Sequence, residues 1–129
     1  MQAGTGQVIV YIVDDDESVR TALARLMRSA GLEPRPYGDP ARFLSEVGNI
    51  ANGVILLDIT MPLHSGTDVL HGLRSRQIVL PVIAVSARDD DDTRKSAREA
   101  GARLFLQKPA DNQALLDAIH WLAGSAAQA

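Results

Sequence analysis

Five short apolar runs alternate with segments of helical periodicity, and this alternation constrains the fold more than any other feature of the chain. The runs cover residues 8–13, 33–37, 54–57, 81–85 and 103–106. Continuous apolar runs of this length are typical of strands that are buried on both faces. Strands and helices in strict alternation favour a parallel sheet covered by helices on both faces. The chain is therefore predicted to be an α/β protein.

Between the runs, apolar residues recur every three or four positions, as they do on one face of a helix. These segments cover residues 19–30, 39–47, 66–76 and 90–100, and a fifth begins at Asp111. Right-handed crossovers and the common order of such sheets predict five parallel strands in the order 2-1-3-4-5. Pro34 and Pro36 interrupt the second run, which places that strand at an edge of the sheet.

The length of 129 residues fits one domain. We expect a flexible leader over residues 1–7, a folded domain over residues 8–123, and a C-terminal tail or the start of a linker over residues 124–129.

Composition excludes several classes of protein. The chain has no cysteine, so it has no disulfide, zinc–thiolate site or cysteine nucleophile. Its net charge of −3 and its aromatic content of 4% argue against direct nucleic-acid binding. The apolar run near the start is too short for a signal peptide or a membrane span. We expect a cytoplasmic protein that contacts neither membrane nor nucleic acid.

Polar residues stand where the predicted strands end. In the order 2-1-3-4-5, strands one, three, four and five are neighbours, so their carboxyl ends meet in one pocket, where ligands of such sheets bind. This convergence is stronger evidence for a site than any single residue. The residues are Asp14, Asp15 and Asp16 after the first strand, Asp58 after the third, Ser86 after the fourth and Lys108 after the fifth.

The acidic residues indicate a cation site. Crowded carboxylates repel one another, and one of them takes up a proton unless a cation intervenes. Mg²⁺ prefers oxygen ligands and commonly accompanies phosphate. We interpret Asp16, Glu17 and Ser18 as capping residues of the first helix, which leaves Asp14 and Asp15 for the metal.

Asp58 and Lys108 indicate phosphoryl chemistry. Asp58 ends an otherwise apolar strand, where an unpaired buried charge is unfavourable, and a carboxylate can attack phosphorus to form an aspartyl phosphate. The chain has eleven arginines but two lysines, so Lys108 suggests a need for a compact point charge close to one oxygen. Ser86 can donate a hydrogen bond to a phosphoryl oxygen.

Together these residues resemble the receiver domain of two-component response regulators. MPLHSGTDVL is similar to the family's Met-Pro-x-x-x-Gly loop and the helix after it, and VDDDESVR looks closest to the FixJ-like branch. The resemblance covers residues 8–122 and implies the flavodoxin-like (βα)5 fold of CheY-like proteins. The family pattern is an acidic pair, a phosphorylated aspartate, a Ser/Thr and a Lys-Pro at four strand ends; here these are Asp14-Asp15, Asp58, Ser86-Ala87 and Lys108-Pro109.

The resemblance implies a phosphorelay switch rather than a metabolic enzyme. Asp58 accepts a phosphoryl group from a histidine kinase, and the domain catalyses only its own phosphorylation and dephosphorylation. The side chains of Asp15 and Asp58 and the backbone carbonyl of Thr60 bind Mg²⁺, and Asp14 supports the metal through water.

The same resemblance implies a conformational response. Ser86 and Lys108 contact the phosphoryl group, and the Lys108–Pro109 peptide bond is cis. Phe105 occupies the position of the family's aromatic switch residue and is expected to turn inward when Ser86 moves.

A partner surface is expected on the fourth helix, the fifth strand and the fifth helix. It would bind a second receiver, in a homodimer formed on phosphorylation, or a downstream output domain or protein. Because side chains alternate along a strand, Phe105 faces away from Leu104 and Leu106, which point to the core. Three arginines are expected to be exposed on this surface: Arg94, Arg98 and Arg103.

Two features depart from the family pattern. Ala110 stands where many relatives carry an aromatic residue after Lys-Pro. FixJ-like proteins usually carry a helix-turn-helix output domain after the receiver, so the chain is either a stand-alone receiver or one excised from a longer regulator.

Two other hypotheses belong to different classes. Asp14-x-Asp16 superficially matches haloacid-dehalogenase-type aspartate phosphatases, but that hypothesis leaves Asp58 unexplained and the chain has little room for a capping domain. A flavodoxin-like cofactor binder needs a first loop that holds a phosphate, whereas this loop is acidic and repels one.

Overall fold

Strands and helices alternate along the whole described part of the chain, as the apolar runs predict. The computed structural model describes residues 7–60, 66–88 and 90–128. The elements are β1 (Ile9–Val13), α1 (Glu17–Ser29), β2 (Glu33–Tyr37), α2 (Pro40–Glu46), β3 (Gly53–Asp58), α3 (Gly66–Ser75), β4 (Val82–Ser86), α4 (Asp91–Ala100), β5 (Leu104–Gln107) and α5 (Asn112–Gln128).

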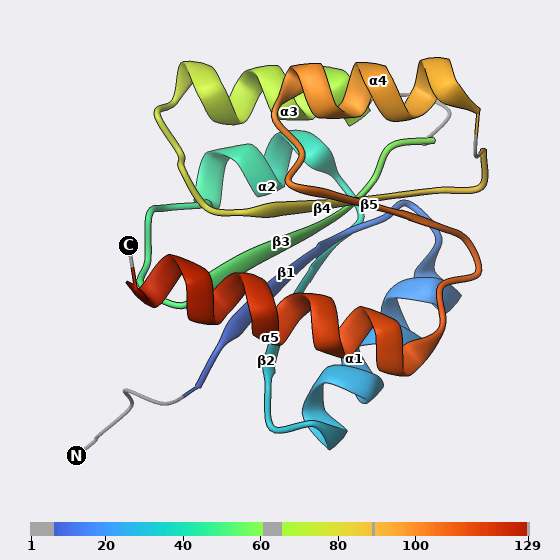
Figure 1. The fold of residues 1–129 in the computed structure, drawn as a ribbon. Helices are drawn as coiled ribbons and strands as arrows, with labels where there is room; N and C mark the ends of the chain where they lie inside the picture. Colours follow the sequence, from blue (N-terminus) through green and yellow to red (C-terminus); the bar gives the residue numbers. More distant parts are fainter. Residues whose placement is uncertain (1–6, 61–65, 89, 129) are drawn as a thin grey trace.

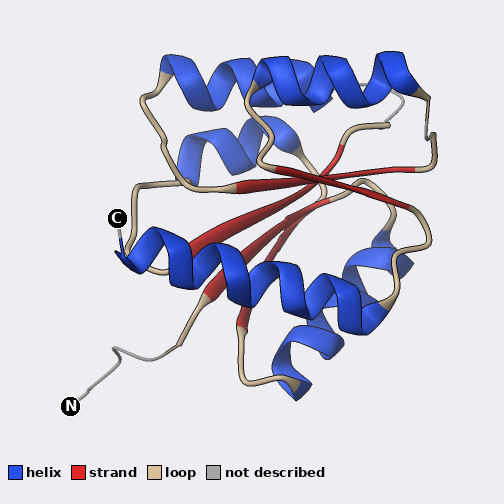
Figure 2. Cartoon of the chain, in the orientation of Figure 1, coloured by secondary structure: helices blue, strands red, loops and turns tan. Residues whose placement is uncertain are grey.

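The strands form one parallel sheet in the order β2-β1-β3-β4-β5, which confirms the predicted topology. Helices α1 and α5 cover one face of the sheet, and α2, α3 and α4 cover the other (Figures 1 and 2). The carboxyl ends of β1, β3, β4 and β5 therefore lie at one edge of the sheet. Every residue of β3 is buried, which explains why the strand is apolar up to its last residue, Asp58.

Side chains that alternate along the central strands build two separate apolar cores. On one face, Val10 and Ile12 of β1 pack with α1 and α5. On the other face, Tyr11 packs with α2 and α3. Phe43 of α2 is fully buried there, with its ring edge-on to Tyr11 at 5.6 Å and to Tyr37 at 5.5 Å between ring centroids.

β2 is an edge strand, as its prolines predict. The backbone N–H of Glu33 donates to Val8, and the carbonyl of Tyr37 accepts from the N–H of Asp14. Because alternate residues of a parallel strand bond to the same neighbour, Pro34 and Pro36 have their nitrogens on the outer side of β2. No ladder hydrogen bond to β1 is lost at these positions.

The ends of the chain add two findings. Residues 1–6 of the predicted leader lie outside the described residues. The last helix continues through Gln128, so residues 124–128 extend α5 beyond the limit of residue 123 that we expected for the domain. None of the helices in the described residues is both long and apolar enough to cross a membrane.

The aromatic cluster gives a test of the packing. We expect Phe43→Ala to lower the free energy of unfolding by about 3–5 kcal/mol and Phe43→Leu by about 1–2 kcal/mol, because alanine leaves a cavity that leucine largely fills. Val79 is 80% exposed, so Val79→Ala is the control and should change stability by less than about 0.5 kcal/mol. Urea denaturation measures the free energy of unfolding of all three variants. An equal decrease for Phe43→Ala and Val79→Ala would contradict the packing described.

Candidate functional site

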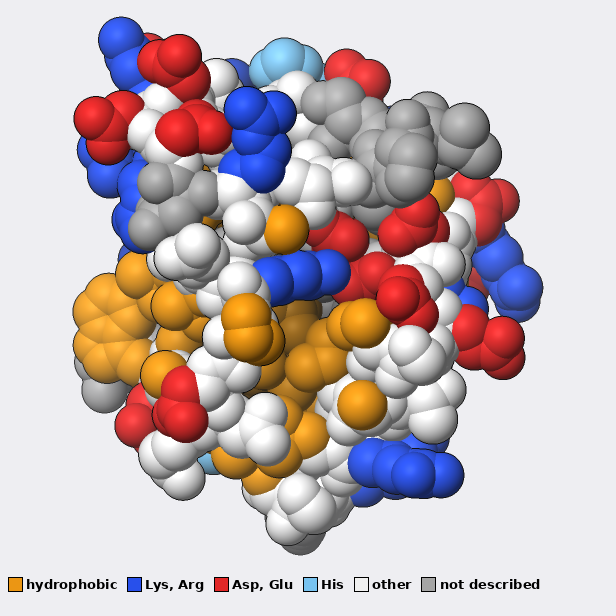
Figure 3. All heavy atoms as spheres, turned by 90° about the vertical axis from the view of Figure 1, so that its right-hand side faces the viewer, with side chains coloured by type: hydrophobic (Ala, Val, Ile, Leu, Met, Phe, Trp, Pro, Cys, Tyr) orange, Lys and Arg blue, Asp and Glu red, His pale blue; other side chains and the backbone are white. Residues whose placement is uncertain are grey.

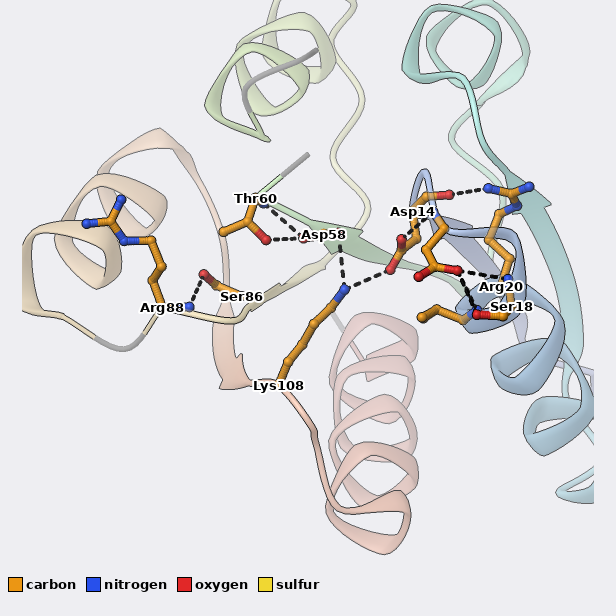
Figure 4. Close-up of polar contacts among 10 residues, drawn as sticks. Asp14, Ser18, Arg20, Asp58, Thr60, Ser86, Arg88 and Lys108 are labelled. Atoms are coloured by element: carbon orange, nitrogen blue, oxygen red, sulfur yellow. Dashed lines mark hydrogen bonds and ion pairs between the residues drawn. The ribbon is translucent and has the colours of Figure 1, made fainter. Parts of the chain in front are cut away.

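Lys108 joins two buried carboxylates at the carboxyl edge of the sheet. Its Nζ lies 3.0 Å from Oδ2 of Asp14 and 3.1 Å from Oδ2 of Asp58 (Figure 4). Both aspartates are buried, with 3% and 6% of their surfaces exposed. The structure thus brings together residues from the ends of β1 and β3 and from just after β5, as the predicted strand order requires.

The surroundings of Lys108 change its acidity. Partial burial by itself lowers the pKa of the ammonium group, but hydrogen bonds and Coulomb attraction from Asp14 and Asp58 outweigh that effect and raise the pKa above 10.5. Lys108 is therefore charged throughout the physiological range, and it neutralises part of the negative charge in the site.

Local hydrogen bonds fix the end of β1. The Oδ1 atom of Asp14 accepts from the N–H of Asp16 at 2.9 Å. Asp16 is the N-cap of α1, where its carboxylate accepts from the N–H groups of Ser18 and Val19. The hydrogen bond from the Ser18 hydroxyl is the main cause that lowers the pKa of Asp16. Asp16 is thus a capping residue, as we interpreted it.

Arg20 is a site residue that the sequence analysis missed. Its Nη1 donates to the backbone carbonyl of Asp14 at 2.7 Å and so holds the end of β1 from the side of α1 (Figure 4). The arginine passes close over Gly38, where a Cβ atom would lie 2.7 Å from Nη1. The VDDDESVR motif contains Arg20, but nothing in helical periodicity indicates that its side chain turns back to the strand.

Thr60 orients the carboxylate of Asp58. Its N–H and its hydroxyl both donate to Oδ1 of Asp58, at 2.9 and 2.8 Å. Lys108 contacts the other oxygen, Oδ2. Both oxygens of the carboxylate therefore have defined partners, which restricts its rotation and presents it at the end of β3.

Three carboxylates fit a hard divalent cation. One oxygen each from Asp14, Asp15 and Asp58 lies within 4.8 Å of the others. Asp15 is exposed, whereas the other two are buried, so the group opens to solvent on one side. Clustered carboxylate oxygens with an open side suit Mg²⁺, which retains several waters when it binds proteins.

Ser86 and the residues after β5 complete this edge. Ser86 is fully buried, and its Oγ accepts a hydrogen bond from the N–H of Arg88 at 2.9 Å. The N–H of Lys108 donates to the carbonyl of Ser86 at 2.7 Å, which ties Lys108 to the end of β4. The Lys108–Pro109 peptide bond is cis, as predicted.

Phe105 lies on the opposite face of β5 from Leu104 and Leu106, as strand alternation predicts. The two leucines pack against the core beneath α1 and α5. The guanidinium carbon of Arg94 lies 4.8 Å from the centroid of the Phe105 ring. Arg94 is half-buried, so our expectation that it is exposed is wrong, whereas Arg98 and Arg103 are exposed as expected.

An apolar hollow adjoins the charged residues. It has a volume of about 670 Å³ and lies between α1 and the residues that follow β5. Figure 3 shows acidic side chains gathered beside this apolar surface. Ala22 of α1 and Ala110 line the hollow from its two sides, and their small side chains leave it open.

Comparison with known proteins identifies the family. The profile of the response regulator receiver domain matches residues 10–120. The chain belongs to this family. It is therefore a receiver domain of the kind found in two-component response regulators, which are signalling proteins rather than metabolic enzymes.

The chain is also similar in sequence to individual response regulators. The chain is 40% identical over 111 residues to the response regulator protein TmoT of Ectopseudomonas mendocina, covering 86% of this chain and 50% of TmoT. It is 33% identical over 110 residues to the transcriptional regulatory protein FixJ of Rhizobium meliloti, covering 85% of this chain and 54% of FixJ. The receiver chain thus spans about half the length of these relatives.

The crystal structure of FixJ-N is similar in fold, with a TM-score of 0.84 and 30% identity over 93% of this chain and 96% of FixJ-N. The structure of the response regulator StyR gives a TM-score of 0.85 and 36% identity over 95% of this chain and 62% of StyR. These similarities confirm the predicted resemblance to the FixJ-like branch and the CheY-like fold.

The raised pKa of Lys108 predicts how stability depends on pH. The folded protein holds the lysine proton more tightly than the unfolded chain, so this stabilisation is complete below about pH 10.5 and is lost as pH rises through the folded pKa. We expect Lys108→Met to lower the free energy of unfolding at neutral pH by about 2–3 kcal/mol, less than for a fully buried pair because 27% of the lysine side chain is exposed.

Urea denaturation with a chelator present, repeated across a pH series, measures this difference. The difference in free energy of unfolding between wild type and Lys108→Met should become smaller above about pH 10.5. Titration of groups distant from Lys108 affects both proteins equally and so cancels. If the two proteins have the same free energy of unfolding at neutral pH, or if the difference between them grows at alkaline pH, the role assigned to Lys108 is contradicted.

Proposed function

We propose that this receiver domain accepts a phosphoryl group on Asp58 from a histidine kinase, with Mg²⁺ as cofactor. The supporting observation is the position of Asp58, a buried carboxylate paired with Lys108 and next to an acidic pair that opens to solvent. The proposed receiver unit covers residues 8–123 and acts in the cytoplasm. It catalyses its own phosphorylation and dephosphorylation and transforms no other substrate.

In the transfer step, an oxygen of Asp58 attacks phosphorus in line with the leaving group. The new O–P bond forms as the P–N bond of the donor's phosphohistidine breaks, and the electron pair stays on an imidazole whose other nitrogen carries a proton. Lys108 lies 3.1 Å from the attacking carboxylate, close enough to stabilise charge on the transferring oxygens. Thr60 holds the carboxylate in place through its two hydrogen bonds.

The metal would be held by the side chains of Asp15 and Asp58 and the carbonyl of Thr60, with Asp14 acting through water. When bound, Mg²⁺ supplies positive charge that offsets the carboxylates and the incoming phosphoryl group. The apolar hollow beside the site would be a binding surface for the donor protein while its phosphohistidine reaches Asp58.

Phosphorylation would be transmitted through Ser86 and Phe105. The phosphoryl group adds negative charge and acceptor oxygens beside Ser86, whose hydroxyl can donate to them in addition to accepting from Arg88. Movement of Ser86 would let the Phe105 ring turn inward and remodel the surface of α4, β5 and α5. That surface would bind a second receiver or an output domain or protein.

A phosphatase of the haloacid dehalogenase type is not favoured. That mechanism needs Asp16 as a partner of Asp14 in catalysis, and here the Asp16 carboxylate is occupied in capping α1. Asp58, which such a mechanism does not use, is the carboxylate that contacts Lys108.

Phosphorylation of the purified protein tests the acceptor. With Mg²⁺ and acetyl phosphate, the wild type should gain one phosphoryl group that is stable in acid and labile in base, as intact-protein mass spectrometry measures. Asp58→Asn should gain none, because an amide oxygen is not a nucleophile toward phosphorus. Incorporation that persists in Asp58→Asn would move the acceptor to another residue.

Metal titration separates the roles of the acidic and basic residues. Asp15→Ala should weaken Mg²⁺ binding about 10-fold or more, because it removes a direct ligand. Lys108→Ala should leave Mg²⁺ affinity largely intact while it uncouples phosphorylation from the conformational response. Asp16→Asn is the matched control, since it removes a nearby charge that is not a ligand; isothermal titration calorimetry measures all three.

If Asp15→Ala and Lys108→Ala weaken Mg²⁺ binding equally, it is wrong to assign Asp15 as a metal ligand and Lys108 as a contact of the phosphoryl group. Weakening by Asp16→Asn as large as that by Asp15→Ala would show that general electrostatics, rather than ligation, determines affinity.

A further inference from the structure

Hydrogen bonds hold Asp14 at the end of β1 through both its side chain and its backbone. The side-chain oxygens accept from the N–H of Asp16 and from Nζ of Lys108, at 2.9 and 3.0 Å. The backbone N–H donates to the carbonyl of Tyr37 at 3.1 Å. The backbone carbonyl accepts from Nη1 of Arg20 at 2.7 Å (Figure 4). Asp14 is therefore fixed against β2, against α1 and against the segment that follows β5.

The hydrogen bond from Arg20 also restricts the residue that follows Asp14. The carbonyl of Asp14 and the N–H of Asp15 belong to one planar peptide group, so a partner on the first orients the second. The Asp15 side chain is exposed, yet one of its oxygens lies within 4.8 Å of oxygens of Asp14 and Asp58. Because few atoms pack against an exposed side chain, the position of this carboxylate depends mainly on the peptide group that carries it.

The position of Arg20 in α1 lets its side chain reach β1. Side chains of a helix point back toward its N-terminus, and Arg20 is the fourth residue of α1. A cation near the N-terminus of a helix opposes the helix dipole, which makes this a slightly unfavourable position for a charged arginine. Arg20 is nevertheless half-buried there, and its hydrogen bond to the carbonyl of Asp14 offsets the unfavourable interaction.

Gly38 leaves the space that the guanidinium group occupies. A Cβ atom at residue 38 would lie 2.7 Å from Nη1 and 2.9 Å from Cζ of Arg20, closer than real Cβ atoms approach other atoms. Any other residue at this position therefore displaces the end of the arginine side chain. Because that end is flexible, the fold can accommodate the displacement. A substitution at Gly38 thus removes the hydrogen bond to Asp14 but leaves Arg20 and its charge in the protein.

We propose that Arg20 is a positioning residue for the metal site. Its hydrogen bond to the Asp14 carbonyl orients the peptide group between Asp14 and Asp15, and so holds the Asp15 carboxylate where it binds Mg²⁺. This role rests on the proposed function, which makes Asp15 a ligand. Arg20 acts through the backbone, because a guanidinium group has no lone pair for a metal. Groups that orient metal ligands commonly change metal affinity by about 10-fold or more.

Electrostatics alone predicts the opposite effect of removing Arg20. A positive charge near a cation site repels Mg²⁺, so loss of the charge strengthens binding if nothing else changes. Loss of the hydrogen bond weakens binding instead, because the Asp15 carboxylate is no longer held in place. Arg20→Met removes both the charge and the donor, whereas Gly38→Ala displaces the donor and keeps the charge. Weaker binding by both variants is therefore the result that positioning predicts.

The binding test measures Mg²⁺ affinity by isothermal titration calorimetry. Arg20→Met and Gly38→Ala should each weaken binding about 5-fold or more. The double variant should be at most about 2-fold weaker than either, because both changes remove the same contact. Two matched controls should change affinity less than about 2-fold. Arg25→Met makes the same charge change at an exposed position of α1, and Gly48→Ala adds a Cβ atom that has no other atom within 4 Å.

Two further readouts separate positioning from a general loss of stability. In the metal-free protein with a chelator, the NMR signals of the Asp14 carbonyl carbon and the Asp15 amide should shift in Arg20→Met and in Gly38→Ala. With acetyl phosphate, the Mg²⁺ concentration that gives half the maximal rate of phosphorylation should rise about 5-fold or more in both variants. The rate at saturating Mg²⁺ should stay within about 2-fold of wild type, and circular dichroism checks that each variant is folded.

Unchanged or stronger Mg²⁺ binding by Arg20→Met would overturn this role. Wild-type affinity in Gly38→Ala, with the Asp14 carbonyl signal shifted, would also overturn it, and so would a lower rate at saturating Mg²⁺ with wild-type metal affinity. Absence of Mg²⁺ binding by the wild type itself would contradict the proposed function and this role with it. The two failures are therefore distinguishable, because only the second removes binding from the unmodified protein.

Discussion

The contact of one lysine with two buried aspartates is the interaction on which the site depends. Without a cation, the like charges of Asp14 and Asp58 would repel each other in a partly dry pocket, which would destabilise the folded protein. Lys108 removes this penalty and leaves the pocket negative enough to attract a divalent cation. The fold makes this contact possible. The strand order places the carboxyl ends of β1, β3 and β5 at the same edge of the sheet, although these strands are far apart in the chain.

The features that follow from periodicity and topology could be predicted from the sequence. Each strand is a run of apolar residues because both faces of the sheet are covered, and the alternation with helices leaves few topologies. The positions of Asp14, Asp58 and Lys108 followed from the same reasoning, since parallel strands place their carboxyl ends together. The resemblance to receiver domains then supplied roles for these residues that spacing alone does not provide.

Other features depend on which residues the long arginine side chains contact in the folded protein, and these contacts could not be predicted from the sequence. Arg20 reaches back to the carbonyl of Asp14 because β2 places Gly38 beside it, and that proximity exists only in the folded sheet. Arg94 looks like a solvent-exposed residue of a polar helix, yet it is half-buried and its guanidinium group lies over the ring of Phe105 on β5. The extension of α5 past residue 123 includes Ala126 and Ala127, which favour a helix that has already started, but it also includes Gly124, which disfavours one, so composition alone does not predict this limit.

The two prolines of β2 have a consequence for how separate molecules can meet. An edge strand can add a strand from another chain when its outward N–H groups are free to donate. Pro34 and Pro36 remove those donors from the outer side of β2, whereas β5 at the other margin contains no proline. Addition of a strand from another molecule is therefore blocked at the β2 margin, so a sheet that continues between copies could join only two of them, through their β5 strands.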